Sequence, residues 1–258
     1  MIANSPANNE ITEATSYEKQ YSLVMDINNL LVLRKTSLVD YPGKVAAALF
    51  FRGCNLRCPW CQNRELALTS NTPNKAFISP DQALRHIEKR RAVLGGVVLS
   101  GGEPTLYRGL PALITRIKAL GLLVKLDTNG TTPYVLETLF SQRETTPDYI
   151  ALDLKLAPAR YTILGAKNPT AQLTESVALI HAAGVDHEFR SLALPYGFFT
   201  DNDIEALAPL VDDAPWFFRR FQPGNCLDPA WDEFPAAQEK DSALLARKAS
   251  QLGKRVSA

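Results

Sequence analysis

The sequence predicts an α/β fold: a partial (β/α)6 open barrel of parallel strands with helices outside. Short apolar runs alternate with longer amphipathic runs, capping residues mark where several amphipathic runs begin, and polar side chains gather just after the apolar runs. Such alternation is typical of a parallel sheet covered by helices. Because six repeats are fewer than the eight of a complete barrel, an open barrel is the first choice, and an open doubly wound sheet is the alternative.

The strand predictions rest on continuous apolar runs. A parallel strand that is covered on both faces lacks the polar alternation of a half-exposed one. The clearest run covers residues 45–51, which directly precede a group of cysteines. The predicted strands are residues 45–51, 97–99, 122–126, 149–154, 187–194 and 216–221.

The helix predictions rest on capping signals. Ser79 can cap a helix whose first residue is Pro80, and Gln82 completes a capping box. Gly184 is placed to end a helix. The predicted helices are residues 80–94, 110–120, a segment that opens at 132–133, 170–183, 201–210 and 240–252.

Composition narrows the class of protein. The chain has 258 residues, 46% of them hydrophobic, and a net charge of +1. This charge gives no electrostatic reason to expect nucleic acid or an anionic membrane as a partner, and no apolar run approaches the ~18 residues of a membrane span. Four cysteines are too few for a disulfide framework, so we expect a reducing, cytoplasmic location. Residues 1–28 form a polar N-terminal extension, and residues 29–258 are predicted to be a single domain.

Several unusual residues lie at or near the carboxyl ends of the predicted strands. The carboxyl ends of parallel strands meet at one side of such a fold and form the site there. We therefore expect these side chains to converge. They are Cys54, Cys58 and Cys61 after the first strand, then Gly101, Gly102 and Glu103, then Asp127 and Thr128, then Asp153 and Lys155, and finally Arg190.

Three of the four cysteines lie within the eight residues of CNLRCPWC. Soft thiolates suit a polynuclear iron–sulfur centre. A four-iron cluster usually has four cysteine ligands, so three would leave one iron open to a small molecule. One alternative is a structural zinc site, which needs a fourth ligand. The other alternative is that the three cysteines are buried and bind no metal. The candidates for a fourth zinc ligand are all remote in sequence: Cys226, His86, His181 and His187.

The C-x3-C-x2-C spacing after a first strand resembles the signature of radical S-adenosylmethionine (SAM) enzymes. The resemblance implies that Cys54, Cys58 and Cys61 hold a [4Fe–4S] cluster and that SAM binds the open iron. It further implies that an electron from the cluster cleaves SAM to a 5′-deoxyadenosyl radical. Trp60 then corresponds to an aromatic residue near the adenine. The segment Gly101-Gly102-Glu103 resembles the family's Gly-Gly-Glu motif, which meets the methionine amino group.

Further segments narrow the resemblance. TSLVDYPGK, FFRGCNLRCPWCQN, LSGGEPT, LDTNG, LDLK and PGNCLDP together resemble the glycyl-radical-enzyme activating enzymes, above all those of anaerobic ribonucleoside-triphosphate reductase. The resemblance covers roughly residues 30–230. It implies that Asp127, Thr128 and Asp153 help to hold a monovalent cation, and that Lys155 and Arg190 contact SAM. A cross-strand ion pair without a ligand is the alternative for Asp153 and Lys155, which share a strand face.

The expected function is therefore generation of a glycyl radical on a partner enzyme, with a flavodoxin- or ferredoxin-type electron donor. Residues 62–225 contain no cysteine, so a second cluster is not supported, and Cys226 is expected to be a packed free thiol. Two rival functions remain. One is a radical SAM enzyme that acts on a small molecule or RNA, and the other is a non-catalytic iron–sulfur electron carrier or metal-binding module.

Overall fold

A computed structural model describes residues 31–68 and 77–257. The N-terminal segment 1–28, predicted as a polar extension, lies outside the described residues. The described part forms one eight-stranded sheet in the sequential order β1 to β8. The pair β1–β2 is antiparallel, and each later pair of neighbours is parallel.

The elements alternate along the chain. The strands are β1 (Leu31–Ser37), β2 (Ala46–Phe51), β3 (Gly96–Gly101), β4 (Leu123–Thr128), β5 (Tyr149–Asp153), β6 (Asp186–Ala193), β7 (Trp216–Arg220) and β8 (Val256–Ser257). The α-helices are α2 (Arg64–Ala67), α3 (Pro80–Arg90), α4 (Leu110–Ala119), α5 (Pro133–Phe140), α6 (Pro169–Ala183), α7 (Asp201–Val211) and α8 (Glu239–Gln251). The short 3-10 helices are η1 (Pro104–Leu106), η2 (Pro158–Leu164), η3 (Pro195–Gly197) and η4 (Pro229–Glu233).

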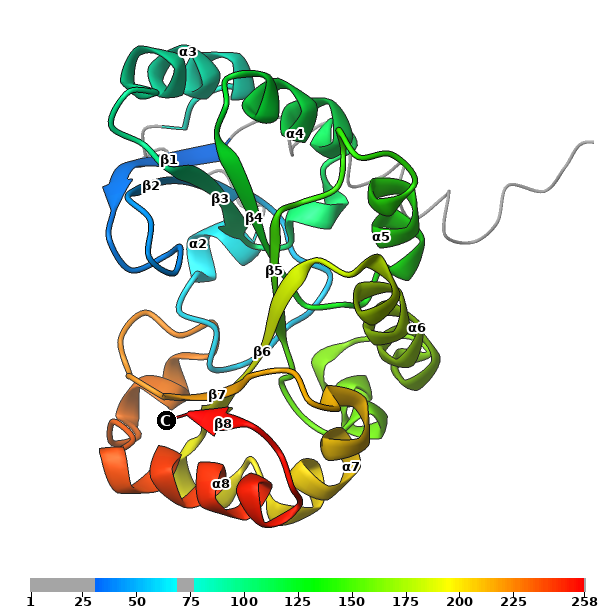
Figure 1. Cartoon of the computed structure of the whole chain (residues 1–258). Coiled ribbons are helices and arrows are strands. Elements are labelled where there is room, and N and C mark those ends of the chain that lie inside the picture. Colours follow the sequence, from blue (N-terminus) through cyan, green and yellow to red (C-terminus); the bar gives the residue numbers. More distant parts are fainter. Residues whose placement is uncertain (1–30, 69–76, 258) are drawn as a thin grey trace, which may run out of the picture.

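The predicted open barrel is confirmed. Strands β2 to β7 correspond to the six predicted parallel strands, and β1 and β8 lie at the two ends of the sheet. Figure 1 shows the sheet curving with helices α3 to α8 along its outer side. No helix in the described parts of the chain combines the length and apolar character that a bilayer crossing needs.

The local signals for helices act as expected. Ser79 and Gln82 form the capping box of α3, with Pro80 as the first helical residue. Thr200 and Asp203 form a second capping box at α7. These reciprocal side-chain bonds satisfy backbone N–H groups that a helix start leaves without partners, which fixes where each helix begins.

The inner side of the sheet has an apolar floor and a charged layer. Side chains alternate between faces along a strand, so on β4 Val124 joins the core under the helices while Lys125 faces the barrel interior. At the floor, Tyr41 packs with Ala48 and Val98. Above this floor the inner side is charged, which brings ionic groups to the carboxyl ends of the strands.

Candidate functional site

The cysteine segment, residues 52–63, follows β2 and is tied to distant parts of the fold. Asn55 donates a hydrogen bond to Thr131 Oγ1 (2.7 Å) beyond the end of β4. The backbone N–H of Arg57 donates to Leu164 O (2.8 Å), at the end of η2. The carbonyl of Pro59 accepts from the backbone N–H of Asp228 (3.0 Å), and Gln62 donates to the carbonyl of Gln222. These contacts attach the segment to chain that follows three other strands.

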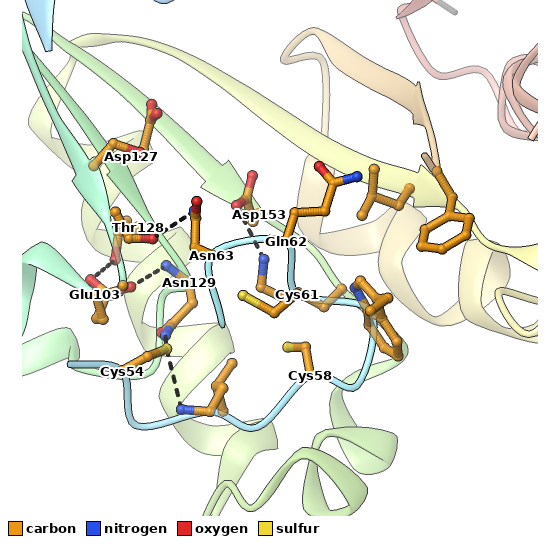
Figure 2. Close-up of a pocket in the computed structure, with 18 of the residues that line it drawn as sticks. Cys54, Cys58, Cys61, Gln62, Asn63, Glu103, Asp127, Thr128, Asn129 and Asp153 are labelled. Carbon is orange, nitrogen blue, oxygen red and sulfur yellow. Dashed lines mark hydrogen bonds and ion pairs between the residues drawn. The ribbon is translucent and has the colours of Figure 1, made fainter. Parts of the chain in front are cut away.

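The three thiols share one cavity. Figure 2 shows Cys54, Cys58 and Cys61 at the edge of a common space, in a pocket with a volume of about 210 Å³. Cys58 is buried, and the other two cysteines are partly buried. The pocket also receives side chains from the ends of β3, β4, β5 and β7. Its lining includes Trp60, Gly101, Gly102, Glu103, Asp127, Thr128, Asp153 and Lys155, all named from the sequence, while Arg190 lines an adjoining pocket.

Burial favours the protonated form of two of the three thiols, those of Cys54 and Cys58. Removal from water raises the pKa of Cys54 to about 11 and that of Cys58 to about 12. Two N–H groups point at the sulfur of Cys54: the backbone N–H of Leu56 at 3.4 Å and the side-chain amide of Asn129 at 3.9 Å. Hydrogen bonds of this kind stabilise a metal-bound thiolate and tune the potential of iron–sulfur clusters.

The residues present fit a [4Fe–4S] cluster with one open iron. Three cysteines line one cavity, and Cys226 does not line it. Among the described residues, no three His, Cys, Asp or Glu side chains converge closely enough to hold a single metal ion. A four-iron cluster would bind each of the three thiolates through a different iron. Binding would release the thiol protons, because the ligands are thiolates.

The Gly101-Gly102 turn requires two residues without side chains. Gly101 has a φ of +117°, and a Cβ there would lie 2.4 Å from the backbone nitrogen of Phe51. A Cβ on Gly102 would lie 1.9 Å from the carbonyl oxygen of Gly53, next to the first cysteine. The two glycines therefore let the end of β3 lie directly against the start of the cysteine segment.

Glu103 is buried, with only 1% of its surface exposed, and its carboxylate is held by several donors. Thr105 donates to Oε1 through both its hydroxyl (2.6 Å) and its backbone N–H (3.2 Å). Thr128 donates to the same oxygen (2.8 Å), and the backbone N–H of Asn129 donates to Oε2 (2.8 Å). Burial nevertheless raises the pKa of Glu103. The carboxylate thus joins the ends of β3 and β4.

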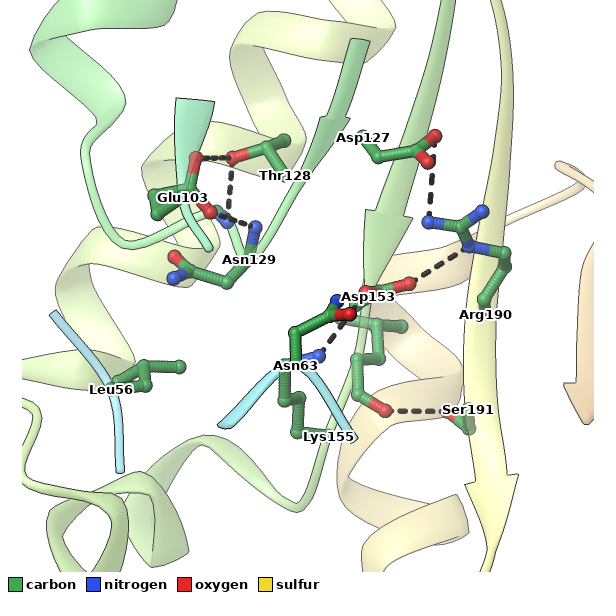
Figure 3. Close-up of polar contacts among 12 residues, drawn as sticks. Leu56, Asn63, Glu103, Asp127, Thr128, Asn129, Asp153, Lys155, Arg190 and Ser191 are labelled. Atoms are coloured by element: carbon green, nitrogen blue, oxygen red, sulfur yellow. Dashed lines mark hydrogen bonds and ion pairs between the residues drawn. The ribbon is translucent and has the colours of Figure 1, made fainter. Parts of the chain in front are cut away.

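A second network crosses from β4 to β6 (Figure 3). Asp153 accepts from Lys155 Nζ (3.1 Å) and from Arg190 Nε (2.8 Å). Burial alone would raise the pKa of Asp153, but these two cations hold it well below its usual range. Burial alone would likewise lower the pKa of Lys155, and the Asp153 carboxylate raises it instead. Arg190 also reaches Asp127, at 3.5 Å.

The three residues expected to hold a monovalent cation are already engaged. Asp127 contacts Lys125, Asp153 contacts Lys155, and the hydroxyl of Thr128 donates to Glu103. The arrangement therefore does not fit a site for a dissolved cation. Asp153 and Lys155 form an ion pair with each other.

Aromatic residues form one wall of the pocket. Trp60 is 3% exposed, and its ring lies 5.5 Å from that of Phe198 and 5.2 Å from that of Trp231.

Cys226 is fully buried, and its backbone N–H donates to Asp232. Burial, followed by the Asp232 carboxylate, raises the pKa of Cys226 to about 12, as for an unreactive packed thiol.

Sequence reasoning missed several residues of the site. Asn129 binds the side chain of Asn55 (2.9 Å) as well as the Cys54 sulfur, and Asn63 donates to the carbonyl of Gly101 (3.1 Å). Lys125 was not named either. Its position two residues before Asp127 was the available signal, because residues i and i+2 of a strand share a face.

Three comparisons place the chain among known proteins. The profile of the "Radical SAM superfamily" matches residues 49–211. A Methanocaldococcus jannaschii protein, whose proposed role is that of a glycyl-radical enzyme activating enzyme, is 29% identical over 83% of this chain and 89% of its own length. The pyruvate formate-lyase-activating enzyme of Listeria monocytogenes is 34% identical over 50% of this chain and 54% of its own. The 7-carboxy-7-deazaguanine synthase of Bacteroides thetaiotaomicron is 36% identical over 36% of this chain and 46% of its own.

Solved structures agree on the fold. A radical SAM methyltransferase from Sphaerobacter thermophilus has a TM-score of 0.63 at 14% identity, covering 84% of this chain and 66% of that one. Streptococcus suis SuiB bound to S-adenosylmethionine has a TM-score of 0.55 at 14% identity, covering 80% of this chain and 48% of that one. The matched region thus covers about half the length of SuiB and of the Listeria enzyme. With the matching profile covering more than half of the chain, the protein belongs to the radical SAM superfamily, whose members use a [4Fe–4S] cluster and S-adenosylmethionine.

Proposed function

We propose that this protein cleaves SAM reductively and generates a glycyl radical on a partner enzyme of the anaerobic ribonucleotide reductase type. The observation that carries the SAM chemistry is the shared pocket, in which three thiols lie with Asp153 and Lys155. The glycyl-radical role is supported by the similarity to the Methanocaldococcus protein, which extends over most of both chains.

Each group in the pocket has a proposed task. Cys54, Cys58 and Cys61 hold the cluster. When bound, the cluster and SAM supply a 5′-deoxyadenosyl radical that takes a hydrogen atom from the partner's glycine. Lys155 provides the positive charge that suits the SAM carboxylate, together with Arg190.

The remaining pocket residues orient the cofactor. The backbone of the Gly101-Gly102 turn would bind the methionine amino group, and Glu103, fixed by its four hydrogen bonds, sets the position of that turn. Trp60, which packs against the rings of Phe198 and Trp231, would contact the adenine. The aromatic wall also keeps water from the reacting atoms.

The partner enzyme would insert its glycine loop at the open side of the barrel. The sheet order leaves β1 at one edge and β8 at the other, so the barrel interior can be approached between them. A flavodoxin- or ferredoxin-type protein would deliver the electron in the cytoplasm. Residues 29–258 would act as a single domain.

The test begins with SAM cleavage. Protein reconstituted with iron and sulfide under anaerobic conditions should, with dithionite, convert SAM to 5′-deoxyadenosine, measured by chromatography. Cys58→Ala is the matched control and should give none. Absence of cleavage by the loaded wild type would favour the electron-carrier alternative.

The second step tests the partner. A candidate anaerobic ribonucleotide reductase, labelled with [2,2-²H2]glycine, should acquire an organic radical signal in electron paramagnetic resonance. The 5′-deoxyadenosine formed should then carry one deuterium, because its methyl group receives the abstracted atom. SAM turnover without a radical on any glycyl radical enzyme would contradict the proposal.

A second candidate is a radical SAM enzyme that acts on a small molecule. It is favoured by the partial similarity to 7-carboxy-7-deazaguanine synthases, although that match covers only 36% of this chain. Deuterium transfer separates the two. A small-molecule enzyme would place deuterium from its labelled substrate, rather than from a protein glycine, in 5′-deoxyadenosine.

A further inference from the structure

A buried layer of charge crosses the barrel interior from β4 to β6. Each strand contributes side chains two residues apart, which share a face. These residues are Lys125 and Asp127 on β4, Asp153 at the end of β5 with Lys155 just beyond it, and Glu188 and Arg190 on β6. The layer has three positive and three negative side chains, so its formal charge is zero.

Lys125 is the most deeply buried cation of this layer. Only 2% of its side chain is exposed, compared with 21% for Lys155 and 20% for Arg190. Its ammonium group contacts Asp127 Oδ1. Arg190 reaches the same oxygen only at 3.5 Å, while its Nε contacts Asp153 at 2.8 Å. Asp127 therefore depends mainly on Lys125 for its counter-charge.

A dissolved cation would add a charge to a layer that is already balanced. Burying an ion without an opposing charge costs roughly several kcal/mol of desolvation free energy, so binding of an extra cation is disfavoured there. If the ammonium of Lys125 were absent, the layer would carry one excess negative charge. A monovalent cation would then restore the balance.

We infer that the Lys125 ammonium is a tethered cation that replaces a dissolved monovalent ion beside Asp127. Lys125 is a positioning residue in this arrangement. It neutralises Asp127 and leaves Arg190 and Lys155 bound to Asp153, at the edge of the proposed SAM site. Binding of SAM therefore requires no added Na⁺ or K⁺. This inference depends on SAM binding in the shared pocket and is independent of the partner enzyme.

Two substitutions of Lys125 separate the effect of losing its positive charge from the effect of losing its side-chain volume. Lys125→Ala removes the ammonium and opens a space beside Asp127, whereas Lys125→Met removes the charge and fills most of that space. A K⁺ ion is close in size to an ammonium group, so it should enter the alanine variant alone. Lys118→Ala is the matched control, because Lys118 also pairs with an aspartate, Asp148, at 3.2 Å but lies on α4.

The principal readout is SAM affinity, measured by equilibrium dialysis on anaerobically loaded protein. Potassium chloride is compared with choline chloride at one ionic strength. Wild type and Lys118→Ala should give dissociation constants that agree within about twofold between the two salts. Lys125→Ala should bind at least about tenfold more weakly in choline, a difference of about 1.4 kcal/mol, and potassium should restore most of the loss. Lys125→Met should be weak in both salts.

A second readout needs no cluster. Potassium should raise the melting temperature of cluster-free Lys125→Ala above the value in choline, because an ion that binds only the folded state stabilises it. Cluster-free wild type should melt at the same temperature in both salts. This measurement distinguishes a cation site from a general loss of SAM binding.

Two results would overturn the inference. One is a wild-type protein whose SAM affinity falls more than about fivefold when choline replaces potassium, a comparison that remains available even if a variant does not fold. The other is a folded Lys125→Ala that binds SAM like the wild type in choline and shows no response to potassium.

Discussion

Replacement of Gly102 by alanine tests how closely the end of β3 must approach the cysteine segment. The new Cβ would lie 1.9 Å from the carbonyl oxygen of Gly53, so the two atoms must separate by about 1.1 Å to reach the 3.0 Å limit that real contacts respect. Gly53 directly precedes Cys54, and its carbonyl accepts a hydrogen bond from the backbone N–H of Glu103 (2.8 Å). Overpacking of this kind costs about 1–3 kcal/mol. We expect Gly102→Ala to lose that stability and most of its bound iron.

Gly121→Ala is the control for the loss of stability. Gly121 has a φ of +78°, and a Cβ added there would have no atom within 4 Å, so alanine is strained by about 1–2 kcal/mol without a clash. Denaturant unfolding of the cluster-free proteins and iron assays after reconstitution should show similar destabilisation in both variants, with iron lost only from Gly102→Ala. Full iron loading and unchanged SAM binding in Gly102→Ala would refute the reasoning.

Three further predictions concern individual side chains. Cys58→Ala should abolish cluster binding while Cys226→Ala retains it, as judged by iron content and the visible spectrum. The ionised form of Asp153 stabilises the fold above an unfolded-state pKa of about 4, and this contribution is lost as the pH falls through the lower folded-state pKa. The difference in unfolding free energy between wild type and Asp153→Asn should therefore stay constant from pH 7 to about pH 4 and begin to narrow as the pH falls to 3. Asp203→Ala removes a fully buried carboxylate that binds an arginine and two backbone N–H groups, and should cost about 3 kcal/mol in denaturant unfolding, against under about 1 kcal/mol for the exposed Asp201→Ala.

Each of these predictions has a contradicting result. Loss of the cluster in Cys226→Ala would mean that the three-cysteine ligand set is incomplete. A difference for Asp153→Asn that stays constant down to pH 3 would show that the carboxylate gains nothing from its cationic neighbours. Equal stability losses for Asp203→Ala and Asp201→Ala would show that burial of the former carboxylate is energetically unimportant.

The fold was predictable where local signals were strong. The apolar run of β2 and the capping box at Ser79 both fall where the sequence indicates, because burial on both faces and reciprocal cap bonds leave direct marks in the sequence. Strand β1 was missed. Its residues Arg34, Lys35 and Thr36 are exposed at the sheet edge, so its apolar run ends at Leu33, halfway along the strand. Strand β8 has two residues, which is too short for any periodic signal.

The site was predictable for residues inside motifs, and less so for residues defined by tertiary contacts. Asn129 lies within LDTNG, yet its bond to Asn55 joins residues 74 positions apart and has no local signature. Lys125 illustrates the same limit. A lysine in a strand usually faces solvent, and its burial follows only from the register that places it between Val98 and Tyr149.

The attachment of the cysteine segment has a consequence for biosynthesis. Within this segment, the side chain of Gln62 donates a hydrogen bond to the carbonyl of Gln222, 160 residues further along the chain. The carbonyl of Pro59 accepts one from the backbone N–H of Asp228. At a translation rate of roughly 5–20 residues per second, about 10–30 s pass before these partners leave the ribosome. The nascent thiols are synthesised early and enclosed late. The cysteine segment can therefore be attached on this side only after β7 and the residues up to Asp228 have been synthesised.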